Sequence, residues 1–171
     1  LAIALTVLPV SAQEPPDVEC DYLLSWTEGS ETLLYALNPT VKRGPLHLRA
    51  DHMIFWIPKG KTVEGFSELY AEGNVVYRRD GHELKAERLY FDAVKDKAFA
   101  IHIRARGRNP KSGVAFQLAA EQAREVARGE FQASEISVSI CDYGVPHFDI
   151  FVQKGRMIGQ SKKEQGALDW L

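Results

Sequence analysis

The chain has 171 residues, of which 45% are hydrophobic and 26% are charged, and its formal net charge is −2. This is the balance of an ordinary globular protein that can bury a core within a single domain. A charge so close to neutral, without a long basic run, gives no electrostatic support for a nucleic-acid-binding protein.

The chain begins with an apolar run, LAIALTVLPVSAQ, that ends in small residues. Val10-Ser11-Ala12 fits a small-x-Ala cleavage site, and the run is shorter than the ~20 residues of a membrane span. We therefore predict that residues 1–12 are the remnant of a signal peptide, that the mature protein starts near Gln13, and that it is exported; a buried strand or helix is the alternative. Residues 13–45 are expected to form an N-terminal tail and an entry strand.

From about residue 46 to residue 152, apolar and polar residues alternate with the period of a β-strand. In three segments, 46–57, 84–91 and 131–140, the alternation changes parity just after Ala50, Ala86 and Ala133. A change of parity within a strand needs a bulge or a sharp corner to keep the apolar residues on one face. These segments therefore predict bent strands with an acidic residue on the outer side of each corner.

Other segments are simpler or ambiguous. Residues 69–77 and 99–105 predict strands without a corner, the second with Phe99, Ile101, Ile103 and Ala105 on one face, and Asp80-Gly81 predicts a hairpin turn. Residues 116–128 are rich in helix-forming residues, yet Leu118-x-Ala120-Glu121 belongs to the same series as the bent strands. We predict a strand there, with a helix as the alternative, although Glu125 stands where the series would place Phe.

Together these features predict an all-β fold, an antiparallel twisted β-jelly roll built from repeated bent strands, over residues 46–153. The recurrence of the phrase every 34 to 36 residues could also indicate a helical repeat. The period of two within each copy excludes that alternative. Such a roll has end strands that must be covered or used for pairing.

The runs LRADHMIFW and AEGNVVYRRDGHELKAERLYFD resemble the periplasmic domain shared by the Lpt lipopolysaccharide-transport proteins. The hallmark is a Leu-x-Ala-Asp corner followed by a Gly-Asn-Val strand, here Gly73-Asn74-Val75, and the resemblance covers roughly residues 46–152. It implies a periplasmic protein that binds lipopolysaccharide or a similar acylated lipid and stacks with like domains by strand addition. The strands near residues 46–57 and 148–153 are the candidate edges.

Ten apolar residues are candidates for lining the lipid trough that this resemblance implies: Leu48, Met53, Phe55, Leu84, Leu89, Phe91, Ile101, Ile103, Ile136 and Val138. Burial of acyl CH₂ groups against them would contribute roughly 0.8 kcal/mol each. Plain core packing is the alternative for each of them. A structural or assembly module of the outer membrane, which uses its sheet edges for protein partners without binding lipid, is the alternative function.

The run FQASEISVSICDYGVPHFDI is similar to the end of the OstA-like N-terminal domain of LptD-type outer-membrane proteins, although Phe148 replaces the usual Trp. This similarity implies that residues 154–171 lead toward an outer-membrane β-barrel outside this chain and that Cys20 and Cys141 form disulfides with that barrel. The two residues themselves allow two alternatives, a disulfide with each other or two free thiols. The chain is then either a fragment of such a protein or a stand-alone OstA-like protein.

No catalytic motif is present in the sequence: it has no Gly-x-Ser-x-Gly, no phosphate-binding loop and no cluster of metal ligands. His47, His52, His82, His102 and His147 are scattered, and we interpret them as solvated or edge residues. We expect no enzymatic activity, no cofactor and no metal site.

Overall fold

The computed structural model describes residues 17–43, 46–79, 82–95, 97–108, 113–127, 130–141 and 147–158. The predicted cleavage site, the Asp80-Gly81 turn and residues 159–171 lie outside these ranges. The strands are β1 (Asp17–Glu19), β2 (Tyr22–Glu28), β3 (Glu31–Leu37), β4 (Thr40–Arg43), β5 (Leu46–Arg49), β6 (His52–Pro58), β7 (Glu68–Arg79), β8 (His82–Asp92), β9 (Lys97–Arg108), β10 (Ala115–Ala127), β11 (Glu130–Ser139) and β12 (Ile150–Ile158). One short 3₁₀ turn, η1 (Val63–Gly65), precedes β7.

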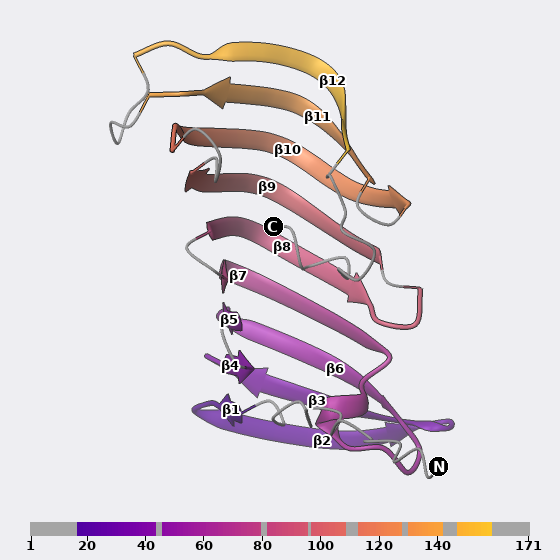
Figure 1. The fold of residues 1–171 in the computed structure, drawn as a ribbon. Helices are drawn as coiled ribbons and strands as arrows, with labels where there is room; N and C mark the ends of the chain where they lie inside the picture. Colours follow the sequence, from indigo (N-terminus) through magenta and orange to yellow (C-terminus); the bar gives the residue numbers. More distant parts are fainter. Residues whose placement is uncertain are drawn as a thin grey trace, which may run out of the picture.

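The strands form one sheet in which every pair of neighbours is antiparallel. The first six strands are halves of three bent strands: β1 continues into β2, β3 into β4, and β5 into β6. β7 pairs with β6 along one half and with β5 along the other. We call each whole bent strand a row. The described part of the chain then has nine rows, which follow one another in chain order (Figure 1).

Each row bends near its middle, so the sheet has two arms. Arm A holds β2, β3, β6 and the halves of β7 to β12 in line with them, and arm B holds β1, β4, β5 and the other halves. The main buried cluster includes residues of both arms, for example Phe55 and Leu89 of arm A and Leu48 and Tyr77 of arm B. The predicted all-β, antiparallel roll of bent strands is confirmed.

Two expectations about individual segments have clear outcomes. Residues 116–127 of the predicted segment 116–128 are a strand, as predicted, because they fall within β10, which pairs with β9 and β11, and residue 128 lies outside the described ranges. Residues 17–43, expected to contain a tail and a single entry strand, contain four strands that make two further rows. The short, interrupted apolar pattern of this region hid the corners after Glu19 and Leu37.

The corners form a continuous line across the sheet, which we call the corner seam: Asp21, Asn38, Asp51, Asn74, Glu87, His102, Glu121 and Glu135. Every second row bends through a non-glycine residue with left-handed backbone, namely Asn38, Asn74, His102 and Glu135, at φ of 50°, 48°, 51° and 50°. This conformation is uncommon for residues with a Cβ, and its recurrence in alternate rows shows that the bend is built in the same way each time.

The predicted corners after Ala50, Ala86 and Ala133 are all present, but the expectation of strands without a corner over residues 69–77 and 99–105 is wrong. β7 bends at Gly73 and Asn74, and because two successive residues there have left-handed backbone, the parity is the same on both sides of the bend. His102 has left-handed backbone, so β9 changes parity there. Ala98, Ala100 and Ile103 are therefore buried, whereas Phe99 and Ile101 project to the opposite face. The sequence concealed this corner because apolar residues occupy both parities around it.

The Leu-x-Ala-Asp and Gly-Asn-Val phrases meet at the seam, which gives them a physical reason. The Asp51 backbone N–H donates to the Gly73 carbonyl at 2.8 Å, and Asn74 Nδ2 donates to Asp51 Oδ2 at 2.8 Å. Gly73 has a φ of 74°, and a Cβ there would lie 2.5 Å from Asp51 Oδ2. Only glycine allows both the conformation and the close approach.

Candidate functional site

The inner face of arm B carries one apolar residue from every row, in register across the sheet. Successive Cα partners in this line are Val18, Val41, Leu48, Tyr77, Leu84, Ala105, Leu118, Val138 and Ile150. Cross-strand neighbours of this kind stabilise a sheet and form a continuous apolar strip. The strip extends over all nine rows that the structure describes.

The inner face of arm A carries a second such line, built from smaller residues: Leu23, Ala36, Met53, Ala71, Leu89, Ala100, Ala123, Ala133 and Gly155. Small residues allow the two arms to approach, and a Cβ at Gly155 would lie 2.6 Å from Ile136 Cδ1, so the Ile136 side chain would have to shift. Phe66 fills the middle of the arm, with edge contacts to Phe55 and Phe91 at ring-centroid distances of 5.8 and 6.3 Å.

Burial of these lines falls steeply from the middle of the sheet to its ends. Met53 and Ala71 are 0% exposed, whereas Ile150 in the last row is 65% exposed and Leu23 in the first row is 51% exposed. Leu118 and Val138, in the seventh and eighth rows, are half-buried. The inner face therefore changes from a buried core in the middle rows into an exposed apolar face at the end rows, where the sequence resemblance predicts a lipid trough.

The structure brings most of the predicted lining residues together. Leu48, Met53, Phe55, Leu84, Leu89 and Ile103 belong to the main cluster, with Phe91 packed against it, while Ile136 and Val138 belong to a second cluster with Ala120 and Ala133. Ile101 does not join them. It is the Cα partner of Arg88 and Gln122, both exposed, because the His102 corner turns its side chain to the outer face.

The sequence interpretation missed three trough residues, Leu118, Ile150 and Val152. Leu118 lies in a segment whose alternation of apolar and polar residues is interrupted by the corner in β10. Ile150 and Val152 belong to the apolar run Ile150-Phe151-Val152, in which the sequence does not distinguish inner from outer positions. The register now places Ile150 and Val152 beside Val138 and Ile136, so both belong to the inner face of the last row.

Only one of the two predicted edges is at the end of the sheet. β12, which covers most of residues 148–153, pairs with β11 alone among the described strands. Residues 46–57 are instead an interior row, because β5 and β6 pair with β4 and β3 on one side and with β7 on the other. The second end row consists of β1 and β2.

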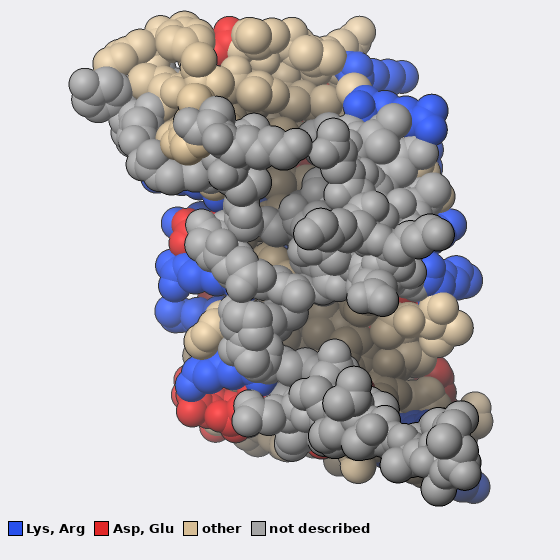
Figure 2. Space-filling model, viewed as in Figure 1, with Lys and Arg blue, Asp and Glu red and all other residues tan. Residues whose placement is uncertain are grey.

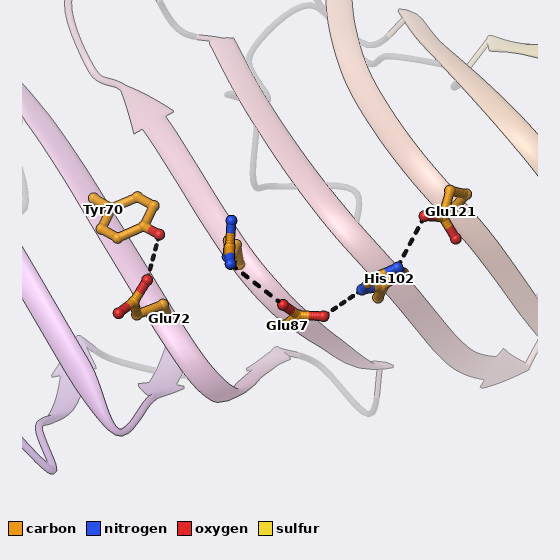
Figure 3. Close-up of polar contacts among 6 residues, drawn as sticks. Tyr70, Glu72, Glu87, His102 and Glu121 are labelled. Carbon is orange, nitrogen blue, oxygen red and sulfur yellow. Dashed lines mark hydrogen bonds and ion pairs between the residues drawn. The ribbon is translucent and has the colours of Figure 1, made fainter.

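The corner seam carries charged residues on the outer side of three neighbouring rows (Figure 3). Glu87 of β8 accepts from His102 Nδ1 of β9, and Glu121 of β10 lies 2.9 Å from His102 Nε2. The hydrogen bond to Glu87, followed by that to Glu121, raises the pKa of His102 above its ordinary value. All three side chains are about half-exposed, so the seam is a solvated feature.

Cys20 and Cys141 are both free thiols in the structure. Cys20 lies in the first row and Cys141 follows the eighth, so the sheet order separates them by seven strand spacings, roughly 30 Å. A disulfide requires Cα atoms within about 7 Å, so this strand order argues against a bond between the two cysteines within one copy, and their pairing stays a prediction. The Cys141 backbone is anchored by Gln117 Nε2, which donates to its carbonyl at 2.9 Å, and by Ser139 Oγ, which accepts from its N–H.

Two kinds of feature are absent from the described residues. No group of three or more His, Cys, Asp and Glu side chains in this part of the chain is placed to hold a metal ion. Within the same residues, no helix has the length and apolar character needed to cross a membrane.

No family model matches the sequence, and no curated protein matches it. Among solved structures, the chain is similar to LptH of Pseudomonas aeruginosa, described as the LptA homologous periplasmic component of the conserved lipopolysaccharide transport device. The two share 10% sequence identity with a TM-score of 0.42, and the match covers 81% of this chain and 94% of LptH. At this identity the similarity concerns the course of the chain alone.

Proposed function

We propose that the protein is a periplasmic lipid-transport domain that holds the acyl chains of a lipopolysaccharide-type lipid in the open part of its trough. The observation that carries this proposal is the change in exposure along one continuous apolar strip, from fully buried Met53 to Ile150 at 65% exposure. A strip needed only for core packing has no reason to remain apolar where no second layer of the described residues covers it.

The trough suits acyl chains because its described wall is apolar and extended. Leu118, Val138, Ile150 and Val152 present branched apolar side chains over three adjacent rows. Burial of lipid CH₂ groups there contributes roughly 0.8 kcal/mol each, so a few chains are held without specific polar chemistry. The sequence resemblance to the Lpt periplasmic domains points to lipopolysaccharide among the acylated lipids.

The end rows support the second part of the proposal, which is stacking with like domains by strand addition. The last row exposes Ile150 and Val152 on its inner face and Phe151 on its outer face, and the first row exposes Leu23 and Trp26 on opposite faces. Strands that are apolar on both faces are typical of sheet interiors. Addition of a partner strand would make each end row an interior strand and extend the trough.

Photo-crosslinking at adjacent positions of β12 tests lipid binding. A crosslinker at Val152 faces the trough and should capture lipopolysaccharide, as should one at Val138. A crosslinker at Phe151 is the matched control, because it faces the other side of the same strand and should capture no lipid. Capture of a protein at all three positions with no lipid at any of them would favour an assembly module instead.

The proposal includes a finer assignment, to the N-terminal part of an LptD-type protein. The sheet order separates Cys20 in the first row from Cys141 after the eighth, which supports disulfide partners outside the described residues for an exported, oxidised protein. Non-reducing gels of the native protein, beside Cys20→Ser and Cys141→Ser variants, should show bonds to another segment or chain. A Cys20–Cys141 bond within one copy would contradict the assignment and favour a stand-alone OstA-like protein.

A further inference from the structure

A hollow of about 560 Å³ lies on the face opposite the trough, over the last four rows of arm A. It is lined by Phe99, Gln122, Ala123, Arg124, Gln132, Ala133, Ser134, Lys154, Gly155 and Arg156. Its size falls within the range of ordinary small-molecule sites, about 300–1,000 Å³. Neither the sequence interpretation nor the proposed function uses it.

The register explains how the hollow is built. Phe99, Arg124, Gln132 and Arg156 are successive Cα partners, so their side chains leave the sheet on the same side. A neighbouring line consists of Gln122, Ser134 and Lys154. The alternating residues Ala123, Ala133 and Gly155 belong to the inner face, so between the two lines the outer face offers only backbone, which forms the floor.

The lining has a consistent chemistry. Arg124, Lys154 and Arg156 supply three cations, Gln122, Gln132 and Ser134 supply neutral donors, and no carboxylate is among the lining residues. Arg124 Nη2 donates to Gln132 Oε1 at 3.0 Å, which orients the guanidinium across the hollow. Figure 2 shows Lys and Arg side chains at both sides of the sheet, not only beside the last rows.

The acids of β7 on the same face are hydrogen-bonded to tyrosines. Tyr70 donates its hydroxyl proton to Glu72 at 2.5 Å, and Tyr90 donates to Glu68 at 2.7 Å. Burial and the Glu68 carboxylate raise the pKa of Tyr90 to about 12, so this pair keeps its proton on the tyrosine. Two exposed carboxylates border the hollow at the corner seam, Glu121 beside Gln122 and Glu135 beside Ser134, and Glu121 is hydrogen-bonded to His102.

We propose that this hollow binds a phosphate group carried on an organic head group. Guanidinium groups bind phosphate oxygens through paired N–H donors, and lysine adds a point charge. Phe99 is half-buried and lies on β9, at the end of the hollow nearest the middle rows of the sheet. It provides an apolar surface for the carbon skeleton that bears the phosphate. Because the site lies on the opposite face from the trough, it does not depend on the proposed function.

Binding is measured with two sources of phosphate, glucose 6-phosphate in solution and phosphatidylcholine vesicles with or without phosphatidic acid. Backbone amide shifts of Ala123, Ala133 and Gly155 report occupancy of the hollow by NMR. We expect Arg124→Gln and Lys154→Gln each to weaken binding about tenfold or more, the effect of losing a charged hydrogen bond. Arg104→Gln is the matched control, since Arg104 is an exposed cation of arm B outside the hollow.

Response to glucose 6-phosphate supports a site for soluble phosphorylated compounds, and response only to vesicles that contain phosphatidic acid supports a lipid head group. Either result sustains the proposal if Arg124→Gln weakens it and Arg104→Gln does not. Absence of amide shifts with both probes overturns it. Equal loss in Arg124→Gln and Arg104→Gln also overturns it, because the attraction would then come from general charge. Failure of the trough crosslinks leaves this result unaffected.

Discussion

The middle and end rows of the sheet share one pattern of alternation but differ in what covers it. In the third to fifth rows, Met53, Phe55 and Leu89 lie between the two arms and are at most 1% exposed. In the last row, Ile150 and Phe151 are 65% and 62% exposed. The comparison teaches that alternation determines which face is apolar, whereas neighbouring rows and the approach of the arms determine whether that face is closed.

The largest expected effect separates the two regions directly. Phe55→Ala should lower the free energy of unfolding by about 3–5 kcal/mol, because it leaves a cavity in the closed part of the core. Phe151→Ala, the matched change in an end row, should change it by less than about 0.5 kcal/mol. Urea unfolding of both variants measures the difference. Similar losses for both would mean that a partner or a second layer covers the end row as fully as the arms cover the middle.

A smaller effect tests whether the corner seam fixes the middle rows. Gly73→Ala should destabilise the fold by roughly 2 kcal/mol or more, because left-handed backbone alone costs roughly 1–2 kcal/mol and the new Cβ meets Asp51. Gly29→Ala is the control, since Gly29 has a φ of 60° with no atom within 4 Å of the added Cβ. Gly29→Ala should lower the free energy of unfolding only by the cost of the left-handed backbone, roughly 1 kcal/mol. Equal changes in the two melting curves would show that Asp51 moves aside freely.

The smallest effect concerns the seam where it approaches the end rows. Asn74, the partner of Asp51, does not titrate, whereas His102 sits between Glu87 and Glu121 with a raised pKa. A group with a raised pKa in the folded state stabilises it fully below the unfolded pKa, about 6.5 for histidine. That contribution is lost as the pH rises through the folded value.

The melting temperature of the native protein should therefore fall slightly as the pH rises from about 6 to about 9. The melting temperature of His102→Gln should fall less over the same range. The His102 ring should titrate above the ordinary histidine value by NMR. Glu87→Gln should bring that titration down more than Glu121→Gln, because the Glu87 hydrogen bond has the larger influence. A ring that titrates at or below the ordinary value would contradict the bridge.

Much of the fold could be predicted from sequence because each prediction depended on local alternation. The corners after Ala50, Ala86 and Ala133 and the inner-face position of nine of the ten candidate residues follow from parity, and the strand at residues 116–127 follows from the repeated Leu-x-Ala-Glu phrase. Ile101 could not, because apolar residues on both sides of His102 hide the reversal. The position of residues 46–57 within the sheet also could not, because it depends on two rows whose strands are short and broken.

The hollow at the far face was missed for a different reason. Arg124, Lys154 and Arg156 belong to two strands that are separated by more than twenty residues and by an intervening row, and nothing in their sequence spacing indicates that they converge. Cross-strand register alone brings them together. Sequence patterns with a period of two predict faces well, but they predict sites assembled across three rows poorly.

The number of rows has a consequence for assembly. With nine alternating rows in the described part of the chain, β1–β2 and β12 both run from arm B toward arm A. A second copy added head to tail, with each arm continued, places its β2 parallel to β12, in the slanted hydrogen bonding of parallel strands. Antiparallel pairing that keeps the trough continuous needs β12 against β12, or β2 against β2, and such a contact has a two-fold axis. The odd number of rows thus links strand direction to symmetry. Parallel pairing of β2 with β12 of the next copy builds an open filament, whereas antiparallel pairing of two identical end rows closes a dimer at that edge.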